Sequence, residues 1–274
     1  QIHTLIKTSQ PDILSLHFVN FSFHPKGFLG ELSPLIKTLR QGIHFNLFLH
    51  ELYVGLRPNI PLRHRVLGWI QRHQFYKAIK AWRPESIHTT NTFYAHVLST
   101  HAVQAQVHPL LSNIPLRATD LSLQQAFLQE ISYAPSDFMV TLPFSFPPSW
   151  SPLPMLHWLR DYCQKHNRTP YLLQVGRTPN ASLYWPLIEK FCFLQNWSCR
   201  QAGPQSENMI SQIFHLTQIG ISGEHIHHVG KSSAVASMRE HGCPIICTGQ
   251  PNQKFRNMDL SPLEQIFDLE VLQK

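Results

Sequence analysis

The strongest constraint on the fold is a regular alternation between short apolar runs and longer amphipathic segments. Most apolar runs are continuous, which is typical of strands covered on both faces. The predicted strands are Asp12–Phe23, His44–Tyr53, Ser86–Asn91, Phe138–Phe146, Tyr171–Gly176, Ser198–Gly203, Gln218–Ser222 and Pro244–Thr248. The predicted helices are Leu29–Arg40, Leu62–Trp82, Thr92–His101, Leu121–Ser132, Leu156–His166, Leu183–Asn196, Glu207–Leu216 and Ser232–His241. This alternation predicts parallel sheets joined by right-handed crossovers.

The 274 residues are enough for two αβα domains of ordinary size. The composition changes at Tyr133–Asp137, and a segment rich in proline and serine follows at Phe144–Pro154. We therefore predict one domain over residues 1–134 and a second over residues 135–274. Ligands of open α/β sheets bind beyond the carboxyl ends of the strands, which predicts a site in the cleft between the domains.

The composition is that of a globular cytoplasmic protein. Charged residues make up 14% of the chain and hydrophobic residues 43%, which argues against disorder. The chain has no apolar run long enough to span a bilayer, and its first residues do not resemble a signal peptide. Its five cysteines are an odd number inside apolar segments, which favours free thiols in a reducing compartment.

A net charge of +7 suits an acidic partner. Basic residues cluster only modestly, so nucleic acid is the weakest candidate and none is predicted. Most of the cluster falls on the predicted helix Leu62–Trp82, which is either a solvated face or a patch for an anionic membrane or acidic substrate. The basic residues are Arg57, Arg63, His64, Arg65, Arg72, His73, Lys77 and Lys80. Core packing is predicted for the tryptophans, which are Trp69, Trp82, Trp150, Trp158, Trp185 and Trp197.

The segment Gly220–Gly249 predicts an anion site. Its pattern predicts a strand end, a loop, a helix, a turn and a buried strand. The residues just before and at the start of the helix are Gly230, Lys231, Ser232 and Ser233. A helix N-terminus offers unbonded N–H groups and a positive dipole end, which favour a phosphate or diphosphate. Lys231 would add a cation. In the alternative interpretation Ser232 only caps the helix.

Histidines at predicted strand ends are the candidates for acid–base chemistry. His50 ends a strand next to Glu51, where an imidazole can bind a hydroxyl or take its proton. Glu51 either orients His50 or caps the following turn. His17 and His88 lie at similar strand ends and are either structural or substrate-binding. No metal is predicted, because the local cluster in EHIHH has no further ligand of fixed geometry; its members are His225, His227 and His228.

Several segments, in order along nearly the whole chain, resemble a GT-B glycosyltransferase of the family 4/1-like kind. They are Asp12–His17, Gly42–Glu51, Leu111–Pro115, Tyr171–Arg177, Ala202–Gly203, Gln218–Ser222 and Gly242–Ile246. The resemblance implies two Rossmann-like αβα domains with parallel sheets facing a central cleft. The N-terminal domain would bind the acceptor and the C-terminal domain the nucleotide sugar.

The resemblance also implies a reaction. A sugar would pass, without a metal or cofactor, from a nucleotide-diphosphate sugar such as a UDP-sugar to an acceptor hydroxyl. His50 and Glu51 would be catalytic, and the substrates would meet Gly176, Arg177, Gly230, Lys231, Ser232, Ser233, His17 and His88. The acceptor would be a carbohydrate, a lipid-linked sugar or a small molecule, with cytoplasmic location or peripheral membrane contact.

The chain departs from the family pattern at three places. Retaining members carry two glutamates eight positions apart, where this chain has Val229 and Ser237. The usual Arg/Lys pair is replaced by LPFSFPPSW, and the first βα unit is expected upstream of Asp12. Two alternatives therefore stay open: a nucleotide-sugar epimerase or hydrolase on the same fold, or a non-catalytic module that binds a nucleotide or a partner.

Overall fold

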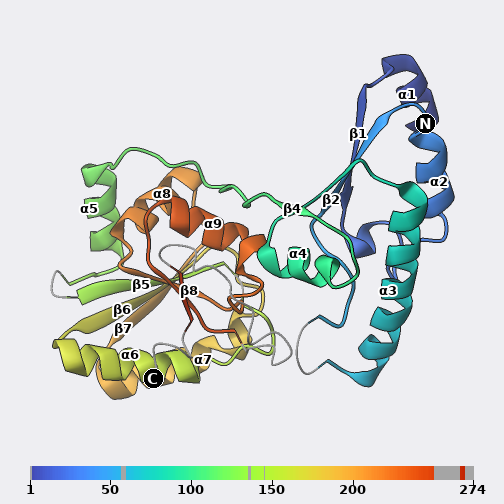
Figure 1. Ribbon diagram of the computed structural model, residues 1–274. Helices are drawn as coiled ribbons and strands as arrows, with labels where there is room; N and C mark the ends of the chain where they lie inside the picture. Colours follow the sequence, from blue (N-terminus) through green and yellow to red (C-terminus); the bar gives the residue numbers. More distant parts are fainter. Residues whose placement is uncertain (1, 57–59, 135–136, 145, 250–265, 269–274) are drawn as a thin grey trace. The chain divides into compact units, whose positions relative to one another are not determined.

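The computed structural model describes residues 2–56, 60–134, 137–144, 146–249 and 266–268. The described chain divides into two compact units, the first ending at Pro109 and the second beginning at Leu110. Each unit contains a parallel sheet with helices packed against it (Figure 1). The α/β class predicted from the alternation of apolar runs is confirmed.

The first unit has four parallel strands in the spatial order β1-β2-β3-β4. The strands are β1 (Ile13–Phe18), β2 (His44–Leu49), β3 (Ser86–Thr89) and β4 (Gln106–Val107). The helices are α1 (Ile2–Ser9), α2 (Leu32–Leu39), α3 (Leu62–Trp82) and α4 (Thr92–Ser99), with a 3-10 turn at Asn20–Ser22.

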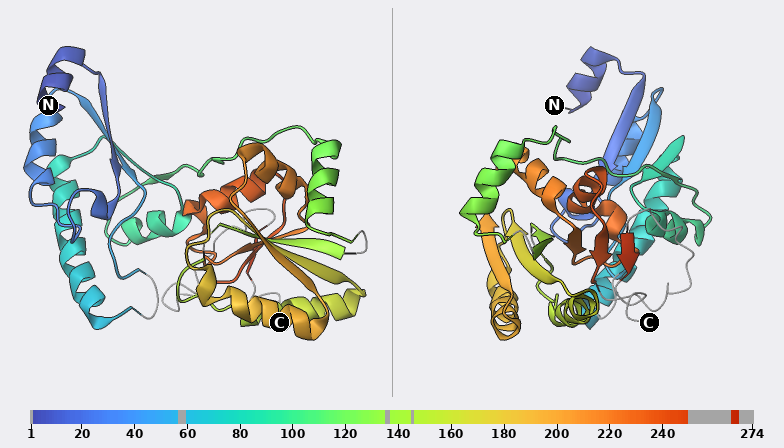
Figure 2. Two further views of the ribbon diagram at one scale, coloured as in Figure 1. Left: turned by 180° about the vertical axis from the view of Figure 1, so that it is seen from behind. Right: turned by 90° about the vertical axis from the view of Figure 1, so that its left-hand side faces the viewer.

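The core of the first unit lies on one face of its sheet. Phe45, Leu47 and Leu49 alternate along β2 and pack with buried residues of α2, α3 and α4. Strands that follow one another in spatial order, joined by right-handed crossovers, place their helices on the same face. Figure 1 shows α2 and α3 on one side of this sheet, and Figure 2 shows the same layer from behind. The opposite face carries exposed and half-buried side chains such as Asn46 and Phe48.

The second unit has the strand order β10-β9-β8-β5-β6-β7, all parallel. Numbered within the unit, this is the Rossmann order 3-2-1-4-5-6, whose switch point lies between β5 and β8. The strands are β5 (Asp137–Pro143), β6 (Thr169–Val175), β7 (Ser198–Gly203), β8 (Ile219–Ser222), β9 (Ile245–Cys247) and β10 (Ile266–Asp268). The helices are α5 (Leu121–Glu130), α6 (Leu153–His166), α7 (Trp185–Gln195), α8 (Glu207–Leu216) and α9 (Ser233–Glu240), with 3-10 turns at Ala181–Leu183 and Val229–Lys231.

Both faces of the second sheet are covered. Tyr171, Leu173 and Val175 of β6 pack on one face with residues of α8 and α9. Leu172 points to the other face and packs with residues of α6 and α7. Figure 1 shows these two helix pairs on opposite sides of the strands. The continuous apolar character of β5 and β6, which predicted burial on both faces, is explained by this three-layer arrangement.

The division between the units falls earlier than the predicted boundary between residues 134 and 135. The backbone after Pro109 finds its partners on α8: Arg117 N donates to Ser211 Oγ (3.0 Å) and Asp120 N to Gln212 Oε1 (2.9 Å). Phe127 of α5 is buried in the second unit's core. The change of composition near residue 135 therefore marks the loop before β5 and not the end of the first unit.

Most predicted elements are present, and three, α3, β7 and α8, agree at both ends. The short strands β4 and β10 and the helix α1 were not predicted. Five of the six tryptophans pack as predicted in or against the described core, but Trp69 is 70% exposed, which contradicts the prediction for that residue. The five cysteines are free thiols. No described helix is long and apolar enough to cross a membrane, and Arg57 and Ser145 lie outside the described residues.

Candidate functional site

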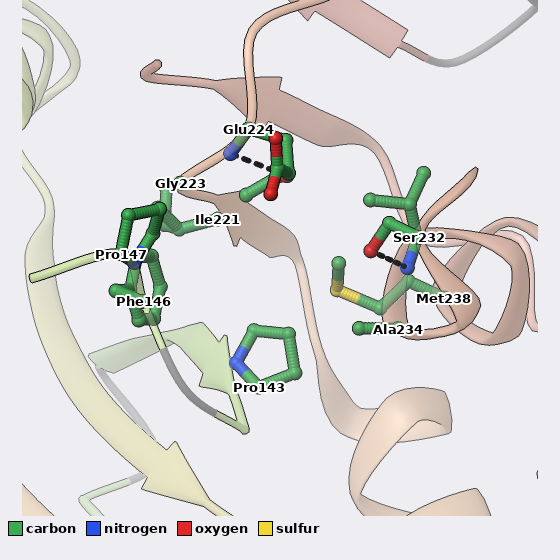
Figure 3. A pocket seen from close by; sticks show the side chains of 11 residues that line it. Pro143, Phe146, Pro147, Ile221, Gly223, Glu224, Ser232, Ala234 and Met238 are labelled. Carbon is green, nitrogen blue, oxygen red and sulfur yellow. Dashed lines mark hydrogen bonds between the residues drawn. The ribbon is translucent and has the colours of Figure 1, made fainter. Parts of the chain in front are cut away.

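A cavity of about 80 Å³, partly open to solvent, lies at the switch point of the second sheet. Its walls come from the carboxyl ends of β5 and β8 and from the start of α9 (Figure 3). The lining residues are Pro143, Phe146, Pro147, Ile221, Ser222, Gly223, Glu224, Ser232, Ala234, Val235 and Met238. Open α/β sheets bind their ligands at this place, because loops on either side of the switch point run in opposite directions.

The loop after β8 is fixed in position. The carbonyl oxygen of Ser222 accepts hydrogen bonds from the backbone N–H and the hydroxyl of Thr248, both at 2.8 Å. The indole of Trp150 donates to the same hydroxyl at 2.8 Å. A Cβ at Gly223 would lie 2.5 Å from the ring of Phe146, so only glycine fits this close approach. The loop therefore presents backbone, not side chain, at residue 223.

The N-terminus of α9 forms the opposite wall. The hydroxyl of Ser232 accepts a hydrogen bond from Val235 N at 3.4 Å and so caps the helix. Ser232 and Ala234 also line the cavity (Figure 3). The remaining N–H groups of a first turn have no acceptor within the helix, and the helix dipole is positive there. This wall favours a negatively charged group.

The structure places the residues predicted for the diphosphate at different distances from the cavity. Ser232 lines it, while Gly230 and Lys231 belong to the 3-10 turn before α9. Ser233 is the exposed first residue of α9. Gly176 and Arg177 follow β6, the neighbour of β5, and are not part of the lining. Gly223, Glu224 and Ala234 line the cavity but were not predicted; the one sequence signal was a glycine directly after a buried strand.

Val229 and Ser237, which occupy the positions of the family's two glutamates, lie in the core of the second unit. Val229 is buried in an apolar cluster. Ser237 is fully buried, and its hydroxyl donates to Ser233 O at 2.8 Å and lies 3.2 Å from the Asn113 amide oxygen. The hydroxyl of Ser112 donates to Ser237 at 2.9 Å. These positions hold the segment after Pro109 against α9.

A cluster of histidines lies on the face of the first sheet opposite to the one that packs against α2, α3 and α4. Nδ1 of His17 and Nε2 of His50 are 3.0 Å apart, and Nδ1 of His88 and Nε2 of His108 are 2.9 Å apart, both hydrogen-bonding distances. The ring of Phe48 lies between the two pairs, with its centroid 4.8 Å from that of His50. The sheet register, which sets His17 beside Phe48 and Phe48 beside His88, explains the cluster. His108 follows the unpredicted strand β4.

The surroundings of His50 and His88 favour neutral rings. Burial, followed by the nearby His17, lowers the pKa of His50 below 6.5, and Glu51 opposes the shift. Burial and His108 likewise lower the pKa of His88. At neutral pH His50 is therefore an imidazole that can accept a proton. His88 also contacts the hydroxyl of Ser86 at 2.8 Å, so both of its ring nitrogens have partners within the sheet.

Two buried polar residues, Thr90 and Asn91, follow β3 at the same edge, each 4% exposed. The Asn91 side-chain oxygen accepts from Tyr94 N at 2.8 Å and caps α4. The amide nitrogen of Asn91 and the hydroxyl of Thr90 have no hydrogen-bond partner in the described chain. Buried polar groups are usually paired, so this edge is a second polar site that the sequence did not predict.

The histidines of the EHIHH segment are packed into the loop between β8 and the following 3-10 turn. His225, His227 and His228 are all buried. Nδ1 of His225 accepts a hydrogen bond from His227 N at 3.2 Å. Among the described residues no group of three or more potential ligands is arranged to hold a metal ion.

Solved structures with the same arrangement are known. HepE of Anabaena in complex with UDP has a TM-score of 0.56 at 11% identity, over 99% of this chain and 71% of its own. A glycosyltransferase of Rickettsia africae has a TM-score of 0.57 at 14% identity, over 97% and 64% of the two chains. The chain has the GT-B fold. The catalytic domain of starch synthase IV from Arabidopsis thaliana shares this GT-B fold, with a TM-score of 0.52, 14% identity and coverage of 96% and 64%.

The GT-B fold implied by the ordered motifs is therefore confirmed, and at these identities the likeness concerns the fold alone. The chain spans about 71% of the length of HepE and about 64% of the other two. No protein-family model and no curated protein matches the sequence.

Proposed function

We propose that this chain acts as a glycosyltransferase that takes a sugar from a nucleotide-diphosphate sugar and passes it to an acceptor hydroxyl. The observation that carries the proposal is the cavity at the switch point of the second sheet, bounded by the N-terminus of α9. HepE, which has the same fold, has been solved in complex with UDP and with UDP-glucose. A diphosphate is the anion that best suits this wall.

The residues around the cavity have distinct roles in this proposal. The first-turn N–H groups of α9 and the backbone of the loop at Gly223 donate hydrogen bonds to the diphosphate oxygens and stabilise the leaving charge without a metal. Lys231, in the turn before α9, supplies a cation. The carboxylate of Glu224 accepts hydrogen bonds, which suits the hydroxyls of the ribose or sugar. Arg177, beside Gly176, is proposed as a second diphosphate contact.

The acceptor side is proposed to lie at the carboxyl edge of the first sheet. His50 takes the proton of the acceptor hydroxyl, since its lowered pKa keeps the ring neutral. His17 positions His50 through their 3.0 Å contact. The unpaired polar atoms of Thr90 and Asn91 offer hydrogen bonds to further oxygens of a carbohydrate, lipid-linked or small-molecule acceptor.

Nucleotide binding is tested by thermal shift with UDP, GDP, ADP and TDP and their sugars. A ligand that binds only the folded protein raises stability in proportion to RT ln(1 + [L]/Kd), so the melting temperature should rise with concentration for one nucleotide class. The decisive variant is Ala234→Glu, which places a carboxylate in the cavity wall. A carboxylate at a helix N-terminus favours folding, so loss of binding would not come from unfolding.

The matched control is Asn208→Glu on α8. Asn208 is the second residue of its helix after a serine cap, as Ala234 is in α9, and it does not line the cavity. We expect Ala234→Glu to weaken nucleotide affinity by about tenfold or more. The nucleotide affinity of Asn208→Glu should equal that of wild type. Equal binding by Ala234→Glu and wild type would exclude the cavity as the diphosphate site. Lys231→Ala should weaken binding sharply, and unchanged affinity would remove Lys231 from the site.

The second candidate is a module that binds a nucleotide or a partner without chemistry. It is favoured by the burial of Val229 and Ser237 at the positions of the family's paired glutamates. The two candidates differ in turnover. Release of free nucleotide from the preferred nucleotide sugar, measured with a panel of sugar and lipid-linked acceptors, supports the transferase; tight binding with no release from any of them supports the module.

A further inference from the structure

The outer face of α3 carries three exposed apolar side chains. Leu62, Val66 and Trp69 are 73%, 55% and 70% exposed. They stand at positions i, i+4 and i+7 of the helix, which places them on one side of its N-terminal half. A contiguous apolar group of this kind, with a tryptophan in it, is uncommon on the free surface of a monomeric protein and marks an interaction surface.

The same helix is strongly basic. It has no aspartate or glutamate along its length, and all five of its lysines and arginines are exposed. They are Arg63, Arg65, Arg72, Lys77 and Lys80. We call the surface formed by these five residues with Leu62, Val66 and Trp69 the α3 outer face. Apolar side chains among basic residues, on a helix that has no acidic residue of its own, point to a partner that is both apolar and anionic.

The inner face of α3 is fixed, so the α3 outer face cannot turn inward. A Cβ at Gly68 would lie 2.2 Å from the backbone oxygen of Val54, which shows how closely the helix meets the loop after β2. The Gln71 side chain accepts from Val54 N at 2.9 Å and donates to Lys26 O at 2.7 Å. Phe75 is buried in the core one turn further on.

We propose that the α3 outer face docks on the surface of an anionic lipid bilayer, with the helix lying in the plane of the membrane. Tryptophan and aliphatic side chains enter the boundary between headgroups and acyl chains, and arginine and lysine stay at the level of the anionic headgroups. Exposed Leu62 and Val66 offer nothing to the phosphates of a nucleic acid, which argues for lipid. The docking does not depend on the proposed transfer reaction.

The test is co-sedimentation of the full chain with vesicles of phosphatidylcholine, alone or with about one third phosphatidylglycerol. Two variants remove the two parts of the surface: Trp69→Ala and the double reversal Arg65→Glu/Arg72→Glu. Phe193→Ala is the apolar control, because Phe193 is 81% exposed on α7. Lys165→Glu/Lys190→Glu is the charge control. It changes the net charge by the same amount as the arginine reversal, but at exposed residues of α6 and α7. Circular dichroism confirms that each variant folds.

Wild type should bind the anionic vesicles at least about tenfold more tightly than phosphatidylcholine vesicles. The arginine reversal should lower the affinity for anionic vesicles by about 25-fold or more, because each basic residue lost lowers it by roughly fivefold. Trp69→Ala should lower the same affinity by about fivefold. Both controls should stay within about twofold of wild type. Absence of binding to anionic vesicles, or equal losses in the controls, would overturn the proposal. Tighter binding to a duplex oligonucleotide through Arg65 and Arg72 would overturn it in favour of nucleic acid.

Discussion

Replacing Gly68 by alanine tests the packing of α3 against the first unit, because two physical effects predict opposite signs. Alanine is the better helix former, so propensity alone predicts a gain of about 1 kcal/mol. The structure predicts a loss. The new Cβ would lie 2.2 Å from the backbone oxygen of Val54 and 2.9 Å from its carbonyl carbon, and neither can be removed by a side-chain rotation.

Relief of this contact requires α3 and the loop at Val54 to separate by about 1 Å, within a core that is already filled. Because the contact is with backbone, the cost of overpacking falls at the upper end of its usual range, about 3 kcal/mol, which outweighs the gain in propensity. We expect a net loss of about 2 kcal/mol. For a unit of this size that loss lowers the melting temperature by about 8 °C.

The assay is differential scanning calorimetry, with Gly30→Ala as the control. A Cβ at Gly30 would meet nothing within 4 Å, so this variant should melt within about 1 °C of wild type. Truncating the side chain in Val54→Ala/Gly68→Ala should not restore stability, because the clash is with backbone. A melting temperature for Gly68→Ala equal to or above that of wild type would refute the packing argument.

Further predictions concern α9 and the histidines. Ser232→Ala should cost about 1 kcal/mol through loss of the helix cap and should weaken nucleotide binding, as read from urea unfolding and thermal shift. Burial lowers the pKa of His225 to about 4. The stability that neutral His225 contributes to the folded state is therefore present above pH 6.5 and is lost as the pH falls toward 4. The lowered pKa values of His50, His88 and His241 act in the same direction. Urea midpoints should therefore fall between pH 7 and pH 4.5, and a flat profile would contradict the argument. His17→Ala should raise the pKa of His50 toward 6.5, measured by NMR titration, because a neighbouring imidazole is removed. His50→Ala should spare nucleotide binding and reduce transfer, and full activity would reject its catalytic role.

The sequence predicted most of the fold because helices and buried strands leave strong local patterns. The limits of α3 and α8 agree with prediction at both ends. The strand β4 has only two residues, too few for any periodicity, and its absence from the prediction also hid His108. Whether α5 belongs to the first or to the second unit depends on hydrogen bonds between residues more than ninety positions apart, and no local pattern encodes such contacts.

The candidate site was predicted only in part, for a similar reason. A glycine- and serine-rich helix start is visible in the sequence, and Ser232 does line the cavity. Its opposite wall comes from Phe146 and Glu224, which the strand order of the sheet brings to the switch point. Trp69 was assigned to the core because its neighbours are apolar, but Gly68 sets which face of α3 packs inward and leaves Trp69 outside.

The most direct test of the central claim is backbone hydrogen exchange, measured with and without saturating UDP or whichever nucleotide the thermal-shift screen favours. If the diphosphate binds at the switch-point cavity, exchange should slow at residues 222–224 and 232–235, which form its two walls. Exchange in α6 and α7, on the other face of the sheet, should not change. Binding of the nucleotide with unchanged exchange in both walls would contradict the account.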